Sequence, residues 1–340
     1  MTRVAVVFTG GTISMRHDAA AGGNVPVLGG ADLLATVPAL GEIADLVAID
    51  RGLTPASHFG FDALFDISRS VEAAIARDDV DGAVVVQGTD TIEETALFYD
   101  LLHVGPKPIV VTGAMRSASQ PGYDGPRNLT DAVRVAASAE AAGADLGVVV
   151  AVDGSIDAAD DVTKTHASAF DTFRSLNRGS LGSVEGGRVL LRQARGPRRH
   201  VAATRAAERV FLVTATVATD GTPIDSLRSA GADGFVVAAT GAGNTDPALL
   251  AAAEAALAEG VPVVLATRCP AGVAGTGYAF PGGGATWLRA GAFLAGHLTG
   301  PKARIALSLG LGAGLRGDDL ASLLADPAPI HDHDRFWDPR

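Results

Sequence analysis

Thr12 is a hydroxyl-bearing residue just after the first apolar run of the chain. It belongs to the segment Phe8–Ser14, with the sequence FTGGTIS, which follows the run Val4–Phe8. Two glycines let the backbone turn sharply and expose its N–H groups. A hydroxyl there could attack a carbonyl carbon once a base has removed its proton, and the N–H groups could stabilise the oxyanion. Alone, such a turn is more often only a turn, and it is neither a dinucleotide fingerprint nor a phosphate-binding loop.

Thr89 and Asp90 follow a second apolar run, Gly82–Gln87. The sequence TIEE, which begins at Thr91, has the spacing of a capping box, so Thr91 is predicted to be the N-cap of a helix. That cap would hold Thr89 and Asp90 in the turn just before the helix, on the same side of a parallel sheet as Thr12. Asp90 could also be only a carboxylate that the helix dipole favours.

Lys164 lies in a polar segment with the sequence DVTKT, which begins at Asp161. A lysine in such a setting is usually solvated. If Lys164 is drawn toward Asp90, the carboxylate would hold its ammonium group. Desolvation would then depress the pKa of Lys164 and let it relay protons toward Thr89.

The elements that must position these residues are predicted from short β-branched runs that alternate with longer Ala- and Leu-rich segments. The order predicts an α/β fold, with a mainly parallel sheet flanked by helices and a ligand site beyond the carboxyl ends of its strands. The predicted strands are Val4–Phe8, Leu46–Asp50, Gly82–Gln87, Pro108–Thr112 and Gly147–Val152, and the predicted helices are Ala31–Val37, Phe61–Ala76, Thr91–Leu102 and Asn128–Ala142.

Arginines crowd residues 191–209, around a Gly-Pro pair, and we interpret this segment as a linker. We therefore expect a larger N-terminal α/β domain over residues 1–190, which carries the candidate residues, a smaller C-terminal α/β domain over 210–328, and a polar tail over 329–340. Asp246 is predicted to cap the helix that follows it. In the smaller domain the predicted strands are Val210–Thr214, Gly234–Ala239 and Val261–Ala266, and the predicted helices are Pro247–Glu259, Pro301–Leu311 and Gly317–Leu324.

Composition narrows the classes of function. The 340 residues carry a formal net charge of -11, scattered along the chain, which disfavours nucleic acid as a partner. The single cysteine, Cys269, cannot form an internal disulfide, and we expect it to be buried. No apolar run is long enough for a signal peptide or a membrane span, so we expect a cytoplasmic protein without a membrane partner. The segment His331–Asp334 could bind a metal ion, but a solvated tail is the favoured interpretation.

The three motifs resemble, in order and spacing, the three signatures of the bacterial-type L-asparaginase/glutaminase family. The segment Thr112–Arg116, the later segment Asp124–Leu129 and the loop Gly241–Asn244 also resemble the family. The likeness runs through nearly the whole chain. Each motif alone would be weak evidence, but together they are specific.

The resemblance implies an amidohydrolase that releases ammonia from the side-chain amide of L-asparagine first and L-glutamine second. Thr12 would form the acyl-enzyme, and Thr89, Asp90 and Lys164 would relay protons, with Asp90 also holding the α-amino group of the substrate. Asn244 matches an asparagine that a neighbouring subunit contributes in the family, which implies a dimer or a dimer of dimers. No metal ion or organic cofactor is implied. The candidate substrate-binding residues are Gly11, Gly88, Asp90, Ser57, Ala114 and Asn244.

Two departures from the family pattern keep other functions open. The family carries a lid tyrosine shortly after the first motif, whereas this chain has no tyrosine between Thr12 and Leu34, and the matching stretch is Gly22–Val27. The segment that holds the α-carboxylate aligns loosely, with Ser57 or Arg51 as substitutes. The alternatives are a hydrolase of a different small amide and a non-catalytic amino-acid-binding relative. An amidase subunit of a tRNA-dependent amidotransferase is disfavoured by the acidic charge and by the lack of a domain before the first strand.

Overall fold

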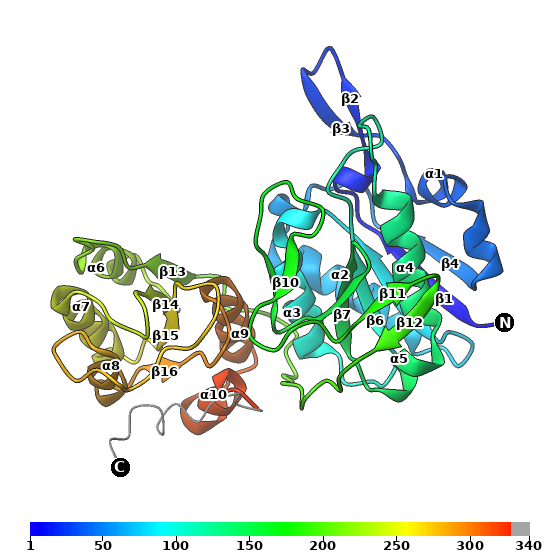
Figure 1. Cartoon of the computed structure of the whole chain (residues 1–340). Coiled ribbons are helices and arrows are strands. Elements are labelled where there is room, and N and C mark those ends of the chain that lie inside the picture. Colours follow the sequence, from blue (N-terminus) through cyan, green and yellow to red (C-terminus); the bar gives the residue numbers. More distant parts are fainter. Residues whose placement is uncertain (328–340) are drawn as a thin grey trace. The chain divides into compact units, whose positions relative to one another are not determined.

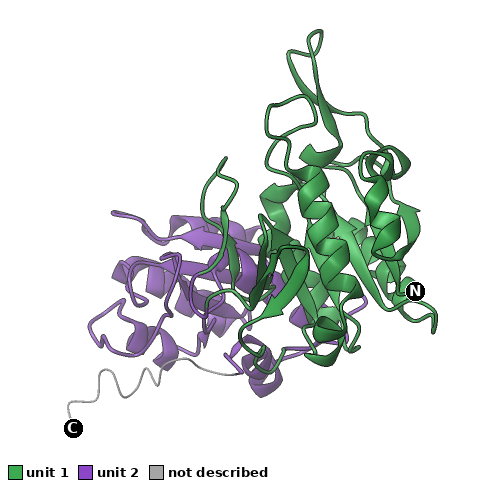
Figure 2. Cartoon of the chain, turned by 45° about the vertical axis from the view of Figure 1, so that its right-hand side comes forward, with its two compact units in different colours: residues 1–175, 179–198 green, residues 176–178, 199–340 purple. Residues whose placement is uncertain are grey.

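The computed structural model describes residues 1–327 (Figure 1). The metal motif His331–Asp334 and the predicted tail, residues 329–340, lie outside the described residues. The chain divides into two compact units (Figure 2). Unit 1 comprises residues 1–175 and 179–198, and unit 2 comprises residues 176–178 and the chain from Arg199 onward.

Unit 1 is built on an eight-stranded sheet with the order β12-β11-β8-β7-β6-β5-β1-β4. The five predicted strands form a parallel half, and three further strands extend it in antiparallel fashion, so the predicted mainly parallel sheet is confirmed. The parallel strands are β1 (Arg3–Phe8), β4 (Asp45–Asp50), β5 (Gly82–Val86), β6 (Ile109–Thr112) and β7 (Val148–Val152), and the antiparallel strands are β8 (Ser155–Ala158), β11 (Gly182–Glu185) and β12 (Arg188–Leu191).

Helices cover both faces of this sheet (Figure 1). The central strands require this, because β5 is buried along its whole length and residues of a strand point alternately to the two faces. Side chains of α1, α4 and α5 share one core with the residues of β1 that point to their face, among them Val4 and Val6. Helices α2 and α3 contact the sheet as well. The bounds are α1 (Gly30–Ala35), α2 (Phe61–Ile75), α3 (Ile92–Leu102), α4 (Gly125–Ala137) and α5 (Ala139–Gly143).

The predicted helix Asn128–Ala142 is wrong in its bounds. The helix begins at Gly125 and breaks at Ser138, which has extended backbone angles. The hydroxyl of Ser138 accepts a hydrogen bond from the backbone N–H of Ala141 and so caps α5. A continuous helical pattern of side chains therefore conceals a capping residue that starts a second helix.

Two short hairpins of unit 1 were not predicted. The first joins β2 (Met15–Asp18) to β3 (Gly23–Pro26), and the second joins β9 (Val162–Lys164) to β10 (Phe173–Ser175). Both lie next to candidate residues, since the first follows Thr12 closely and the second carries Lys164.

Unit 2 has a four-stranded parallel sheet in the order β13-β14-β15-β16. The side chain of Asp246 accepts a hydrogen bond from the backbone N–H of Ala248 at 2.8 Å, which confirms the predicted cap. Strand β16 and helices α6 and α8 were not predicted. The elements are β13 (Val210–Thr214), α6 (Thr222–Ser229), β14 (Gly234–Ala239), α7 (Pro247–Ala258), β15 (Val263–Thr267), α8 (Gly284–Arg289), β16 (Phe293–Leu294), α9 (Gly300–Gly312) and α10 (Gly317–Leu324).

The prediction that Cys269 is buried is wrong, because its thiol is exposed. Strand β15 ends two residues earlier, at Thr267, and the hydroxyl of Thr267 accepts the backbone N–H of Cys269 at 3.0 Å. Cys269 therefore lies after the buried strand rather than within it. In unit 2, as in unit 1, none of the described helices is both long enough and apolar enough to cross a membrane.

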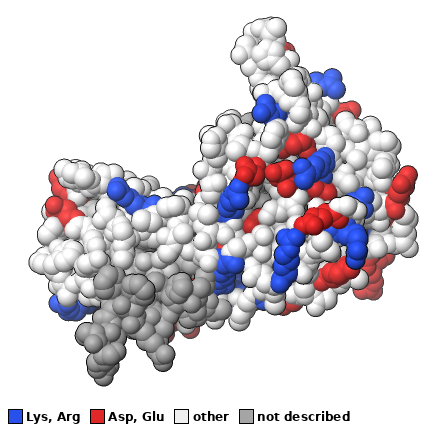
Figure 3. All heavy atoms as spheres, in the orientation of Figure 1, with Lys and Arg blue, Asp and Glu red and all other residues white. Residues whose placement is uncertain are grey.

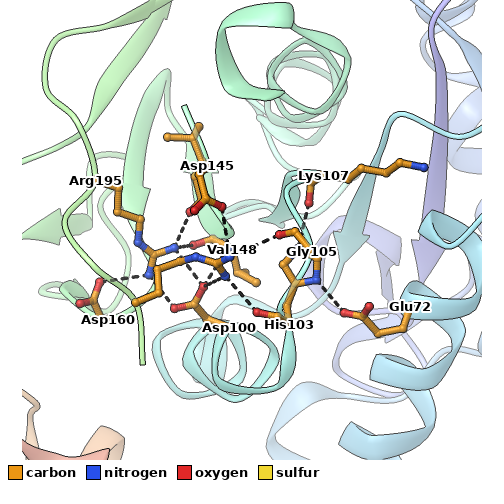
Figure 4. Close-up of polar contacts among 11 residues, drawn as sticks. Glu72, Asp100, His103, Gly105, Lys107, Asp145, Val148, Asp160 and Arg195 are labelled. Atoms are coloured by element: carbon orange, nitrogen blue, oxygen red, sulfur yellow. Dashed lines mark hydrogen bonds and ion pairs between the residues drawn. The ribbon is translucent and has the colours of Figure 1, made fainter. Parts of the chain in front are cut away.

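Arg195, from the segment 191–209, is buried in unit 1 at the centre of a polar cluster (Figure 4). Its side chain is 4% exposed and donates to Asp100, which is 2% exposed, at 2.6 Å. Burial alone would lower the pKa of Arg195, but the charges of Asp100 and Asp160 outweigh burial and raise it. Buried charges need such partners, so this cluster fixes the end of unit 1. Elsewhere, basic and acidic side chains are interspersed on the face of unit 1 that Figure 3 shows.

Candidate active site

Two turns at the carboxyl ends of neighbouring strands touch each other through glycines. Strands β1 and β5 are parallel neighbours with Phe8 opposite Val86. After β1, Gly11 has a φ of 94°, where residues with a side chain are strained. A Cβ added to Gly11 would lie 2.2 Å from the backbone nitrogen of Gly88. Only glycine fits at this position, and the turns that carry Thr12 and Thr89 are packed backbone against backbone.

Thr12 begins a short 3₁₀ turn, η1 (Thr12–Ser14), and is half-buried. Within residues 1–327 its hydroxyl makes no hydrogen bond. The side chain of the next residue, Ile13, is fully buried in the core of unit 1. The nucleophile candidate thus stands between a tightly packed glycine and an anchored isoleucine.

Lys164 joins Thr89 and Asp90 in one polar cluster. Its ammonium nitrogen lies 3.0 Å from Thr89 Oγ1 and 2.7 Å from Asp90 Oδ1. The side chain of Lys164 is 12% exposed, whereas that of Asp90 is 78% exposed, and Thr89 is buried. The cluster therefore has a buried end at the hydroxyl and an open end at the carboxylate, where a charged ligand can approach.

Glu93 holds Lys164 from a direction that the sequence did not indicate. Its carboxylate, in the first turn of α3, accepts the backbone N–H of Lys164 at 3.3 Å. Strand β9 thereby lies against the start of α3, and the lysine side chain extends toward the turn η4 (Thr89–Thr91). The only sequence signal for Glu93 was its place two residues after Thr91.

Thr91 occupies the predicted N-cap position of α3, but the predicted capping box is wrong, because its side chain makes no capping hydrogen bond. The hydroxyl instead donates to the carbonyl of Ala56 at 3.4 Å. Ala56 starts another 3₁₀ turn, η3 (Ala56–His58), which packs against η4. A tertiary contact thus replaces the local cap and brings the segment after β4 to the site.

The remaining substrate-binding candidates of unit 1 lie around this cluster. Ser57 is exposed in η3, whose first residue lies 3.1 Å from where a Cβ of Gly88 would be. Ala114 is fully buried after β6, next to Gly113. A Cβ on Gly113 would lie 3.0 Å from Cγ2 of Thr89. The ends of β1, β4, β5 and β6 therefore meet at one edge of the sheet, as the sequence predicts.

Asn244 belongs to unit 2, where it closes a tight loop. The backbone N–H and the hydroxyl of Thr240 both donate to the carbonyl of Asn244, at 3.0 and 2.7 Å. The side-chain oxygen Oδ1 of Asn244 is buried and has no hydrogen-bond partner within residues 1–327. A buried amide oxygen without a partner is unusual.

Asp124 organises the loop after β6, which the motif sequence alone did not predict. Its carboxylate accepts the backbone N–H groups of Met115 and Arg116, both at 2.9 Å, and the side-chain amide of Asn128, also at 2.9 Å. The loop then contacts the β2–β3 hairpin, where Ala118 donates to the carbonyl of Met15 at 3.0 Å. The resemblance had pointed to this segment without giving it a role.

Within residues 1–327 no group of three or more His, Cys, Asp or Glu side chains is arranged to hold a metal ion. The chemistry that the described residues can supply at the site is that of hydroxyls, an ammonium group, carboxylates and backbone N–H groups.

Comparisons with known proteins cover nearly the whole chain. The family model "Asparaginase, N-terminal" matches residues 3–196, and "Glutaminase/Asparaginase C-terminal domain" matches residues 209–324. A probable L-asparaginase of Deinococcus radiodurans is 34% identical, with 94% of this chain and 96% of the relative covered. A probable periplasmic L-asparaginase of Haemophilus influenzae is 31% identical over 92% of this chain and 89% of its own length.

A solved structure is similar to this chain over nearly its whole length. The probable cytoplasmic L-asparaginase of Campylobacter jejuni superposes with a TM-score of 0.84 at 27% identity, with 95% of this chain and 99% of that chain covered. The two family models, the relatives and the solved structure therefore agree over both units. The chain belongs to the asparaginase/glutaminase family and is an amidohydrolase of the asparaginase type.

Proposed function

We propose that the chain hydrolyses the side-chain amide of L-asparagine through an acyl-enzyme on Thr12, and acts on L-glutamine more slowly. One observation carries the proposal. Lys164 contacts both Thr89 and Asp90, and the turn that bears these two residues packs against the turn that bears Thr12. Two relatives named as probable L-asparaginases match this chain over most of their length, which supports asparagine as the substrate.

In the acylation step, the oxygen of Thr12 bonds to the amide carbon, and its proton leaves toward the cluster. Thr89 lies 3.0 Å from the lysine nitrogen, so Thr89 can take the proton of Thr12 while it passes its own proton to Lys164. In the same exchange Lys164 gives one proton to the leaving nitrogen, which departs as ammonia. Water attacks the ester by the reverse path and releases aspartate. Backbone N–H groups of the turns at Gly11 and Gly88 stabilise the oxyanion.

Asp90 selects the substrate by charge. Its carboxylate is mostly exposed, and Lys164 donates a hydrogen bond to only one of the two oxygens, Oδ1. A solvent-facing carboxylate at the mouth of the site favours an amide with an α-ammonium group over a simple amide. Ser57 belongs to the adjoining turn η3, and in this proposal it binds the α-carboxylate.

A different small amide remains the second candidate, because of Asn24. This residue stands in β3, within the stretch that corresponds to the lid segment of the family. Its side-chain oxygen accepts a hydrogen bond from Ser117 at 3.2 Å. The side-chain amide of Asn24, held by the neighbouring loop, offers a substrate different chemistry from that of the lid tyrosine of the family.

The assembly that we propose is a dimer or a dimer of dimers, with Asn244 reaching the site of a partner subunit. The buried, unpartnered Oδ1 of Asn244 supports a ligand or partner group at that loop. We also propose a cytoplasmic location, in line with the description of the Campylobacter relative.

Ammonia release on asparagine, glutamine and simple amides tests the function. We expect asparagine to be the best substrate, and Thr12→Ala to lose roughly three decades of rate or more, as for other members of catalytic groups. Thr130→Ala is a matched control, since Thr130 is also a half-buried threonine of unit 1 but bonds to its own helix. Unchanged release by Thr12→Ala would reject the nucleophile, and faster turnover of another amide would favour the second candidate.

A further inference from the structure

Tyr123 reaches the nucleophile turn from the loop after β6. Its hydroxyl donates a hydrogen bond of 2.7 Å to the backbone carbonyl of Ile13. Ile13 is the residue directly after Thr12 in the turn η1. A side chain 110 residues further along the chain therefore holds the carbonyl of the residue that follows the candidate nucleophile.

The phenol is held by rigid neighbours. Tyr123 directly precedes Asp124, whose carboxylate fastens the loop to the start of α4. Its ring lies over Gly125, where an added Cβ would be 2.5 Å from a ring carbon and 2.6 Å from the hydroxyl oxygen. The absence of a side chain at Gly125 thus makes room for the ring, and the ring packs against the core of unit 1.

Without this bond, the turn would be held less firmly on the side that follows Thr12. Before Thr12, Gly11 is locked against Gly88. After Thr12, the N–H of Ser14 donates to the carbonyl of Gly11 at 2.9 Å, and the bond from Tyr123 adds a tertiary restraint on the same Ile13–Ser14 peptide unit. Loss of that restraint would let the turn shift with the hydroxyl of Thr12, and an error of about 1 Å in placing a reacting group costs roughly a hundredfold in rate.

We propose that Tyr123 is a positioning residue that orients Thr12 for attack, an inference that rests on the proposed role of Thr12. Its contribution is a fixed hydrogen bond to the turn rather than proton transfer. Burial, and secondly the charge of Asp124, raise the pKa of Tyr123 to about 12, against a smaller opposing effect of Arg16. The hydroxyl therefore stays protonated and donates throughout the neutral range.

Tyr123→Phe removes only the hydroxyl and keeps the ring over Gly125. Tyr99→Phe is the matched control, because the hydroxyl of Tyr99 is buried in the same unit and has no hydrogen-bond partner within residues 1–327. With asparagine as substrate, we expect kcat to fall about tenfold or more in Tyr123→Phe and KM to stay within about twofold. Tyr99→Phe should keep kcat within about twofold, since it breaks no hydrogen bond.

A fall in kcat at unchanged KM separates positioning from a structural role, and the pH profile separates positioning from proton transfer. A purely structural loss would lower the fraction of folded enzyme, which unfolding curves measure, without changing kcat per folded molecule. Equal kcat values for Tyr123→Phe and Tyr99→Phe, with Thr12→Ala inactive, would overturn this inference alone. Activity in Thr12→Ala would overturn the proposed function as well. Loss of a pH-rate limb below pH 9 in Tyr123→Phe would show proton transfer by the phenol and overturn the positioning role.

Discussion

Lys164→Met is the substitution that separates the chemistry of the site from its architecture most clearly. Methionine keeps the unbranched stem of lysine and removes the ammonium group. The change therefore deletes the contacts to Thr89, at 3.0 Å, and to Asp90, at 2.7 Å, and leaves the packing of the stem in place. The hydrogen bond from the backbone of Lys164 to Glu93 is also kept.

The expected effects on rate and on stability differ greatly. A positioned proton-transfer group contributes roughly 10²- to 10⁴-fold to a rate, so kcat on asparagine should fall by about three decades. The ion pair itself is worth only about 0–1 kcal/mol, because Asp90 is 78% exposed and water screens its charge. The free energy of unfolding should therefore change by no more than about 1 kcal/mol.

The assay pairs ammonia release with urea unfolding on the same preparations. Lys107→Met is the control, because the ammonium group of Lys107 donates to the carbonyls of Ile75 and Arg77, at 2.8 and 2.7 Å. Lys107 precedes β6, at the opposite end of the strands from the site. That control should lose about 1–3 kcal/mol of stability and keep its kcat. If Lys164→Met keeps more than about a tenth of the wild-type kcat, the relay through this lysine is refuted.

Three further experiments test other parts of the account. Asp90→Asn should raise KM for asparagine about tenfold or more, because a neutral amide no longer attracts the α-ammonium group; an unchanged KM in steady-state assays would contradict this. Arg195→Met should cost about 3–5 kcal/mol in urea unfolding by leaving Asp100 buried with less compensation, and should spare the kcat of folded enzyme; a wild-type unfolding curve would be the opposing result. Co-expressed Thr12→Ala and Asn244→Ala subunits should regain roughly a quarter of wild-type activity if sites are shared in a dimer, whereas no recovery would place Asn244 in its own subunit's function only.

The parallel strands could be predicted because each is a short β-branched run buried on both faces. Strand β5, with the sequence GAVVV, is fully buried. The antiparallel strands β8 and β11 mix polar and apolar residues within four positions, so their pattern does not differ from that of loops, and β12 has only three apolar residues after an arginine. The same limit hid the hairpin that carries Lys164, since β9 has only three residues.

The site could be predicted in part, through residues at strand ends. Thr12 and Thr89 lie in the turns after two buried strands, and the turns after neighbouring parallel strands lie at the same edge of the sheet. The contact between Lys164 and Thr89, by contrast, spans 75 residues and depends on a hairpin seated on α3. The bond from Tyr123 to Ile13 likewise depends on tertiary packing, which no local pattern encodes.

Identification of the acylated residue tests the central claim most directly. Enzyme turning over asparagine is quenched in acid, digested with trypsin and analysed by mass spectrometry. The two candidate threonines fall on separate peptides, residues 4–16 for Thr12 and residues 78–116 for Thr89. The account predicts an aspartyl adduct on the peptide 4–16 that disappears in Thr12→Ala. An aspartyl adduct on the peptide 78–116 instead would contradict it.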